Sequence, residues 1–304
     1  MTFILFFIGL AGLIVGGELL VRGAVGIAQR FHVPPLVIGL TIVGFGTSMP
    51  ELLVSVQAAL GGSPALAVGN VVGSNIANIL LILGLSALII PVTLNFSSLK
   101  RDFIFLIGST FALWGVLMDG DVTRIEGTVL VLALAVYLWI SLWGSREIPE
   151  TIIPSRPVWQ SALLLALGFA GLLLGAKALV TSATEMARAF GVSEAVIGLT
   201  IVAIGTSLPE MATGIVAAVK KHPEIAIGNI LGSNIFNILG ILGITAVITP
   251  IPVGSEFSSL DIGLAVASAL AFLALAVLPG RVGRLAGGGF LASYGGYLVF
   301  LGMS

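Results

Sequence analysis

Long apolar stretches follow one another along this chain, separated by short polar connections. Each stretch is close to the roughly 20 residues that a helix needs to cross the hydrocarbon core of a bilayer. The pattern therefore predicts an all-α membrane protein with ten transmembrane helices. These expected spans cover approximately residues 3–27, 34–60, 65–91, 103–118, 125–143, 158–182, 194–219, 224–249, 260–279 and 285–302.

The two halves of the chain repeat a segment. Residues 36–80 and 195–239 align without a gap, and 25 of the 45 positions are identical. Five spans in each half is an odd number, so the second half must enter the membrane from the opposite side. We therefore expect two inverted five-helix repeats, residues 1–143 and 158–304, joined by a cytoplasmic linker at 144–157.

Basic residues indicate the orientation, because Lys and Arg are enriched in cytoplasmic loops. With both termini extracytoplasmic, the outer loops hold only Arg124 and Arg188. The inner loops then hold Arg30, Lys100, Arg101, Arg146, Arg156, Lys220, Lys221, Arg281 and Arg284. This bias predicts a multi-pass protein of the cell membrane.

Composition narrows the class further. Charged residues make up 9% of the chain, against about 25% in soluble domains. No basic patch suggests nucleic acid, no protein partner is implied, and the lipid bilayer is the expected surrounding. With no cysteine in the chain, disulfides and thiolate chemistry are excluded.

Each repeat contains the sequence Gly-Thr-Ser-X-Pro-Glu inside an apolar span, ending at Glu51 or Glu210. A carboxylate within a bilayer is costly and marks a functional site by default. Pro50 and Pro209 cannot donate to the carbonyl four residues earlier, so they predict broken helices at the midplane. Such a break is tolerated where it lines a cavity buried in the protein.

The next span of each repeat supplies amides and hydroxyls. Asn70, Ser74 and Asn78 are four residues apart and share one helical face, and Asn229, Ser233 and Asn237 repeat that pattern. Together with the carboxylates and the Thr-Ser hydroxyls they form a set of hard oxygen donors. Such donors suit Ca²⁺, whereas zinc and copper favour the sulfur and imidazole ligands that these spans lack.

Simpler structural explanations compete with this interpretation. A buried carboxylate can be neutralised by a neighbouring cation, but spans 2, 3, 7 and 8 hold no Lys or Arg except Lys220 at one end. The small residues of the Asn-containing spans also suit tight helix packing, which can coexist with ion binding. Glu18 has Arg22 one turn later, and we expect an ion pair there.

Two motifs occur in both repeats, Gly-Thr-Ser-X-Pro-Glu and Gly-Asn-X-X-Gly-Ser-Asn-X-X-Asn. This duplicated pair resembles the alpha repeats of the cation/calcium antiporter superfamily, most of all those of its prokaryotic sodium/calcium exchanger branch. The resemblance implies that spans 2, 3, 7 and 8 form an ion-binding core and that spans 1 and 6 slide past it. It also implies that Ca²⁺ and Na⁺ are cargo and that no cofactor is needed.

Carried over position by position, the resemblance gives an expected ligand set. It implies central carboxylates at Glu51 and Glu210, backbone oxygens at Thr47 and Thr206, sodium-site hydroxyls at Ser48, Ser207, Ser74 and Ser233, assisting carbonyls at Gly44 and Ala203, and an amide at Asn78. Asn237 departs from the pattern, because archaeal exchangers carry aspartate there. The core therefore has two formal negative charges in place of three.

Several function classes remain open on the sequence alone. The first is an antiporter that exchanges calcium for sodium by alternating access, with a calcium/proton antiporter of the same fold as the alternative. A passive cation channel would also use broken helices with oxygen ligands. An enzyme is not expected, because no histidine lies in a span and no Gly-X-Ser-X-Gly motif is present.

Overall fold

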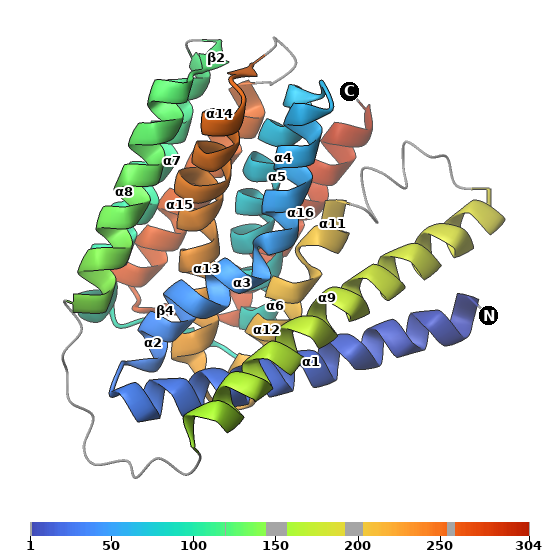
Figure 1. Cartoon of the computed structure of the whole chain (residues 1–304), viewed down its shortest axis with the longest axis vertical. Coiled ribbons are helices and arrows are strands. Elements are labelled where there is room, and N and C mark those ends of the chain that lie inside the picture. The colour runs from blue at the N-terminus through green and yellow to red at the C-terminus, as the bar shows by residue number, and fades with distance from the viewer. Residues whose placement is uncertain (1, 119, 144–156, 192–202, 254–258, 304) are drawn as a thin grey trace.

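The computed structural model describes residues 2–118, 120–143, 157–191, 203–253 and 259–303. Within these ranges the protein is nearly all-helical, as expected (Figure 1). Eight helices are long and apolar enough to cross a membrane, and a bent pair adds a ninth. The expected seventh span, 194–219, and the linker at 144–157 lie partly outside the described residues.

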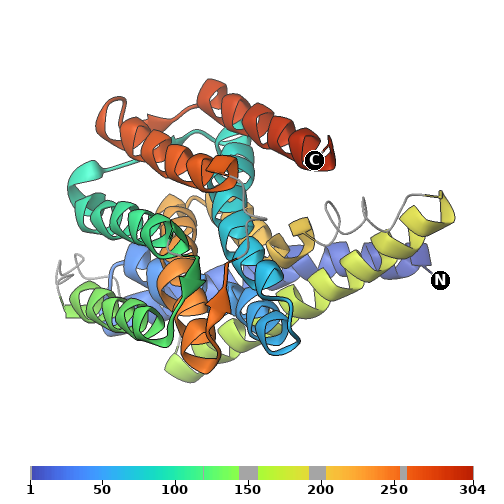
Figure 2. The same ribbon diagram turned by 90° about the horizontal axis from the view of Figure 1, so that it is seen from above.

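Helices α1 (Thr2–Phe31) and α9 (Val158–Ala189) form a long pair across one side of the molecule (Figures 1 and 2). Glycines allow their backbones to meet. A Cβ on Gly16 would lie 2.6 Å from the backbone nitrogen of Leu172, and one on Gly168 would lie 2.5 Å from that of Leu20. At about 45 Å, each helix is longer than the roughly 30 Å hydrocarbon core, which leaves room for a tilted crossing.

The second span is broken where the sequence predicts. It consists of α2 (Pro35–Ile38), the π-helical segment η1 (Gly39–Val43) and α3 (Gly44–Thr47), followed by α4 (Met49–Leu60) at an angle of 42°. Ser48 leaves helical geometry at the junction, with φ −86° and ψ 8°. The second repeat has the same break at Ser207, φ −87° and ψ 5°, between α11 (Ala203–Thr206) and α12 (Leu208–Val219).

The third and eighth spans change helix type at an asparagine. The helix α5 (Pro64–Ala77) continues as the π-helical segment η2 (Asn78–Leu83) and α6 (Gly84–Ile89). In the second repeat α13 (Pro223–Phe236) continues as η4 (Asn237–Leu242) and α14 (Gly243–Ile248). Single π-helical turns inside α-helices are frequent at functional sites. Neither π-helical segment follows from the sequence pattern.

The remaining spans are α7 (Phe96–Met118), α8 (Arg124–Trp143), α15 (Ser259–Val277) and α16 (Arg284–Met303). Four two-residue strands, also not anticipated, tie their ends together. The strand β1 (Val92–Thr93) pairs with β4 (Arg281–Val282), and β2 (Asp121–Val122) pairs with β3 (Ile251–Pro252), both antiparallel.

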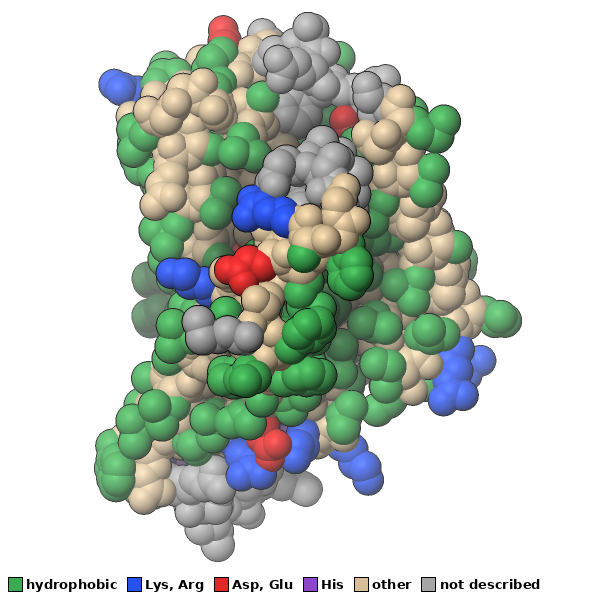
Figure 3. Space-filling view, turned by 90° about the vertical axis from the view of Figure 1, so that its right-hand side faces the viewer, with side chains coloured by type: hydrophobic (Ala, Val, Ile, Leu, Met, Phe, Trp, Pro, Cys, Tyr) green, Lys and Arg blue, Asp and Glu red, His purple; other side chains and the backbone are tan. Residues whose placement is uncertain are grey.

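The outer surface suits lipid. On the face shown in Figure 3, hydrophobic side chains form a band, with charged side chains above and below it. Large apolar side chains such as Phe7, Trp139 and Leu174 are about two-thirds exposed. The spans Pro64–Ile89 and Pro223–Ile248 are the most buried, at 72% and 89% of their apolar windows. The polar motif residues therefore lie at the centre of the bundle.

Candidate ion-binding site

The two motif carboxylates occupy matching places at the helix breaks. Glu51 is the third residue of α4 and Glu210 the third residue of α12, and their exposed fractions are 1% and 2%. Each lies in the first turn, where the helix dipole stabilises negative charge. Ser48, three residues before Glu51, lies 3.0 Å from Glu210 Oε1, so the two breaks lie side by side. The proline breaks thus bring together carboxylates 159 positions apart.

At both breaks, an asparagine of the following span donates a hydrogen bond to the backbone carbonyl of the glutamate. Asn70 Nδ2 on α5 donates to the Glu51 carbonyl at 3.0 Å, and Asn229 Nδ2 on α13 donates to the Glu210 carbonyl at 3.2 Å. Asn229 is fully buried and Asn70 is partly buried. These amides fix the height of each carboxylate relative to the neighbouring span.

Serines of one repeat approach the carboxylate of the other. Ser48 Oγ donates to Glu210 Oε1 at 3.0 Å. Ser207 occupies the equivalent position at the second break and is 2% exposed, and its hydroxyl has no hydrogen-bond partner among the described residues. The contact of Ser48 with Glu210 shows that the cluster is shared between the repeats.

Further contacts join the first break to α13. The Thr47 hydroxyl lies 3.1 Å from Asn229 Oδ1 and 3.0 Å from the Val43 carbonyl. Ser233 Oγ donates to the Gly44 carbonyl at 3.3 Å. A Cβ on Gly232 would lie 2.3 Å from the Leu40 carbonyl oxygen, so only glycine permits this approach. Gly232 thus serves both helix packing and the geometry of the site.

Several oxygens at the centre have no hydrogen-bond partner among the described residues. They are Oε2 of Glu51, Oε2 of Glu210, and Oδ1 of Asn78 and Asn237. Both asparagines are 1% exposed. A buried polar group without a partner costs about 1–3 kcal/mol, and a cation bound by these oxygens would remove that penalty. Hard oxygen donors of this kind fit Ca²⁺ or a monovalent cation of similar size.

The other predicted residues near this centre differ in how deeply they are buried. Ser74 is buried on α5, and Thr206 is half-buried beside the second break. Ala203 begins α11, and its side chain lies outside the described residues. Asn75 and Asn234, each one position after a motif serine, donate at 2.7 Å to carbonyls of their own helices.

Two neighbouring hydroxyls were missed by the sequence analysis. Ser55 accepts from Asn70 Nδ2 at 2.9 Å and donates to the Ala67 carbonyl at 3.3 Å. Thr213 is fully buried, and its hydroxyl has no partner among the described residues. Their spacing could have revealed them, because Ser55 follows Glu51 by four positions and Thr213 follows Glu210 by three.

A buried carboxylate outside the site was also missed. Asp102 on α7 is 0% exposed and accepts from Arg101 Nη2 at 3.0 Å and from Tyr137 Oη at 3.3 Å. Arg101 Nη1 also donates to the Ile140 carbonyl at 3.3 Å. The arginine balances the charge, and the cluster fastens α7 to α8. A structural role accounts for it.

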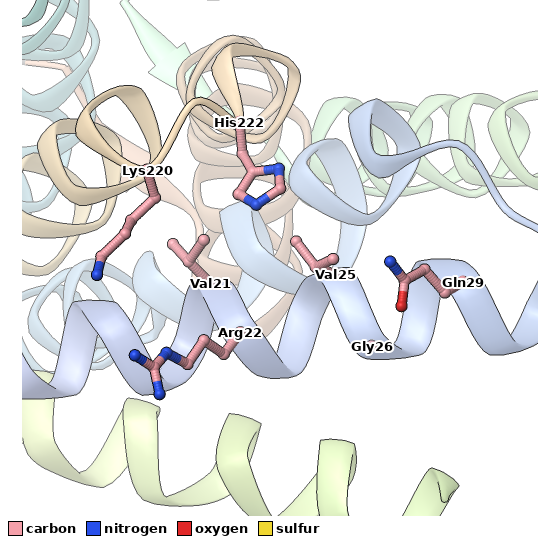
Figure 4. Close-up of a pocket in the computed structure, with 7 residues that line it drawn as sticks. All are labelled: Val21, Arg22, Val25, Gly26, Gln29, Lys220 and His222. Carbon is pink, nitrogen blue, oxygen red and sulfur yellow. The ribbon is translucent and has the colours of Figure 1, made fainter. Parts of the chain in front are cut away.

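A pocket of about 290 Å³ lies apart from the carboxylates, between α1 and the α12–α13 connection (Figure 4). Lys220 and His222 extend from that connection toward α1, whose Val21 and Val25 face them. The expected pair of Glu18 with Arg22 is present, and Lys220 Nζ also lies 2.9 Å from Glu18 Oε1. This ion pair links α1 to the end of α12.

Among the described residues, no group of three or more His, Cys, Asp or Glu side chains gathers. The formal charge of the central cluster thus comes from two carboxylates, with neutral oxygens around them. The fold and the cluster define an integral membrane protein with a buried set of oxygen donors at paired helix breaks, which is the candidate cation site.

Comparison with known proteins agrees with this class. The chain matches the family described as "Sodium/calcium exchanger protein" over residues 1–143 and 160–303, and it belongs to that family. It is 38% identical over 304 residues to the inner membrane protein YrbG of Escherichia coli (strain K12), covering 94% of each chain. It is 30% identical to the sodium/calcium exchanger MaX1 of Methanosarcina acetivorans, covering 83% of this chain and 84% of that one.

Solved structures of the sodium-calcium exchanger NCX_Mj have the same fold. One of them covers 99% of this chain and 98% of its own, with a TM-score of 0.86 and 33% identity. The family consists of transporters, and the resemblance to the cation/calcium antiporter superfamily is confirmed. The family's Ca²⁺ and Na⁺ are cargo and no cofactor takes part.

Proposed function

We propose that this protein exchanges Ca²⁺ for Na⁺ across the cell membrane by alternating access. The observation that carries the proposal is the pair of buried carboxylates, Glu51 and Glu210, at matching helix breaks and surrounded by neutral oxygens. Both ions require the same oxygen cage, so occupancy by one excludes the other. The proposed ligands are Glu51, Glu210, Thr47, Thr206, Ser48, Ser207, Asn78, Asn237, Ser74 and Ser233, with the carbonyls of Gly44 and Ala203.

The proposed architecture is two inverted repeats, residues 1–143 and 158–304, with a cytoplasmic linker at 144–157 and both termini extracytoplasmic. The strand pairing supports it. In chain order β3 is the counterpart of β1, and β4 is the counterpart of β2, yet β1 pairs with β4 and β2 with β3. The strands β3 and β4 flank the span α15, so they belong to opposite sides of the membrane. Because β1 pairs with β4, β1 belongs to the side opposite its counterpart β3, as inverted repeats require.

Alternating access requires one part of the molecule to move against another. The packing supports α1 and α9 as the moving pair, since their mutual contact is the most extensive between any two described elements. Their apolar contacts with α12 belong to a hydrophobic cluster separate from the main core. An apolar interface of this kind suits sliding by a small translation of packed helices.

Counter-transport follows if the change between access states requires the two carboxylates to be neutralised by bound cations. Bare carboxylates in a closed site are penalised, whereas carboxylates neutralised by Ca²⁺ or by monovalent cations are permitted. A calcium/proton antiporter of the same fold is the second candidate. Asn237 favours keeping it, because the aspartate of archaeal sodium/calcium exchangers is missing at that position.

The test is calcium flux in liposomes containing the purified protein, with sodium, potassium and proton gradients imposed separately. We expect calcium uptake to follow the sodium gradient. Uptake that follows only the proton gradient would select the second candidate. Uptake that ignores every gradient, or single-channel currents far above carrier rates, would contradict antiport altogether.

The carboxylates can be tested in the same vesicles. Glu51→Gln and Glu210→Gln each remove one of the two charges, and we expect either to abolish sodium-driven calcium uptake. Glu224→Gln is the matched control, because Glu224 is an exposed carboxylate in the first turn of α13. Equal activity of the Glu210 variant and the control would remove Glu210 from the proposed ligand set.

A further inference from the structure

The pocket between α1 and the α12–α13 connection has a basic lining that the central cluster does not use. Its polar lining residues are Arg22 and Gln29 on α1 and Lys220 and His222 on the connection (Figure 4). All four side chains can donate hydrogen bonds, and those of Arg22 and Lys220 are positively charged. None of the residues that line the pocket is acidic. The lining therefore favours an anion.

The positive charge beside the pocket is only partly balanced. Glu18 Oε1 accepts from Arg22 Nη2 and, at 2.9 Å, from Lys220 Nζ. Among the described residues, neither cation has another acidic partner. One carboxylate thus balances two cations, and a surplus positive charge remains. A guanidinium and an ammonium also have more N–H donors than one oxygen accepts, so donors remain for a ligand.

The pocket lies where membrane helices end. The helix α12 ends at Val219 and α13 begins at Pro223, so residues 220–222 form a connection between two expected spans. Val219 is 52% exposed, which places an apolar side chain next to the charged end of the helix. Val21 and Val25 give the pocket an apolar wall (Figure 4). Basic pockets between membrane helices suit anionic headgroups on the cytoplasmic side, where the proposed topology puts this connection.

We infer that this pocket binds an anionic phosphate group, with Lys220 and His222 as donors from the connection and Arg22 as the donor from α1. Its volume of about 290 Å³ is at the lower end of the range of ligand pockets, roughly 300–1,000 Å³, and suits a small headgroup. A lipid phosphodiester and free phosphate share this chemistry. A bound phosphate would join α1, one of the proposed moving helices, to the core helices α12 and α13.

The first measurement is binding to the purified full chain. Phosphatidylglycerol is titrated into the protein in detergent and counted by native mass spectrometry, with phosphatidylcholine as the zwitterionic comparison. Inorganic phosphate is titrated separately and measured by equilibrium dialysis. Preferential binding of phosphatidylglycerol identifies a lipid site, and binding of inorganic phosphate identifies a site for the free ion. Binding of neither probe would overturn the inference.

The site is located with a pair of neighbouring lysines. Lys220→Gln removes a charge-assisted donor, and we expect it to weaken binding of the bound probe by roughly tenfold or more. Lys221→Gln is the matched control, because Lys221 is exposed on the same connection and does not line the pocket. We expect it to weaken binding by roughly fivefold at most, through general attraction to basic side chains. Equal weakening by the two changes would overturn the pocket as the site.

Glu18→Gln tests the same site in the opposite direction. It releases Arg22 and Lys220 from their shared carboxylate and removes a negative charge beside the pocket. We therefore expect binding to tighten by roughly fivefold, and weaker or unchanged binding would contradict the inference. This variant decides the question if Lys220→Gln fails to fold.

These measurements involve neither calcium nor sodium, so they are independent of the proposed antiport. A protein that binds phosphate in this way but moves no calcium would overturn the proposed function alone. A protein that exchanges calcium but binds neither probe would overturn this inference alone.

Discussion

The closest backbone approach in the site gives a sharp prediction for Gly232→Ala. The added Cβ would lie 2.3 Å from the Leu40 carbonyl oxygen and 2.8 Å from the Leu40 carbonyl carbon, and real Cβ contacts do not fall below 3.0 Å. These are backbone atoms, so no side-chain rotation relieves the clash. The helix α13 must therefore move from η1 by roughly 0.7 Å or more, as expected for overpacking of a tight interface.

That displacement acts on the contacts between α13 and α3. The Thr47–Asn229 distance of 3.1 Å and the Ser233–Gly44 distance of 3.3 Å would approach or pass the hydrogen-bonding limit. Losing both, at about 1 kcal/mol each, would raise the calcium concentration for half-maximal uptake by roughly ten- to thirty-fold. The free energy of unfolding should fall by about 1–3 kcal/mol.

The assay is sodium-driven calcium uptake in liposomes at several calcium concentrations, with thermal unfolding measured in detergent. Gly108→Ala is the control, because a Cβ on Gly108 in α7 meets nothing within 4 Å among the described residues. Adding Leu40→Ala should not rescue Gly232→Ala, since the clash involves the backbone. Unchanged half-saturation and unfolding for Gly232→Ala, or full rescue by Leu40→Ala, would refute this reasoning.

Two further variants test contacts between the parts of the molecule. Ser48→Ala removes the donor 3.0 Å from Glu210 Oε1, and we expect calcium half-saturation to rise roughly tenfold; an unchanged value would contradict this role. Lys220→Gln breaks the 2.9 Å link to Glu18 on α1 and should shift the balance of access states, roughly a few-fold at most because both side chains are partly exposed. Spin-label distances can report this shift, since the chain has no native cysteine. Arg22→Gln, whose pair lies within α1, should shift it less.

The sequence determined the class of the protein and the chemistry of its site. The apolar stretches predicted membrane helices because backbone groups in lipid must be satisfied within a helix. The duplicated Pro-Glu motif predicted two helix breaks carrying carboxylates, and the structure has both breaks. The ion pair of Glu18 with Arg22 was also predicted, because it depends only on spacing along one helix.

Only the tertiary structure decided how the two repeats meet. Ser48 donates to Glu210 of the other repeat, and Lys220 reaches Glu18 on α1. Neither contact follows from periodicity, because both join residues more than 160 positions apart. The pairing of β1 with β4, and the π-helical segments that begin at Asn78 and Asn237, also depend on packing between spans. Local spacing fixes which side of a helix a residue occupies, whereas the partner on that side is set by how whole helices pack.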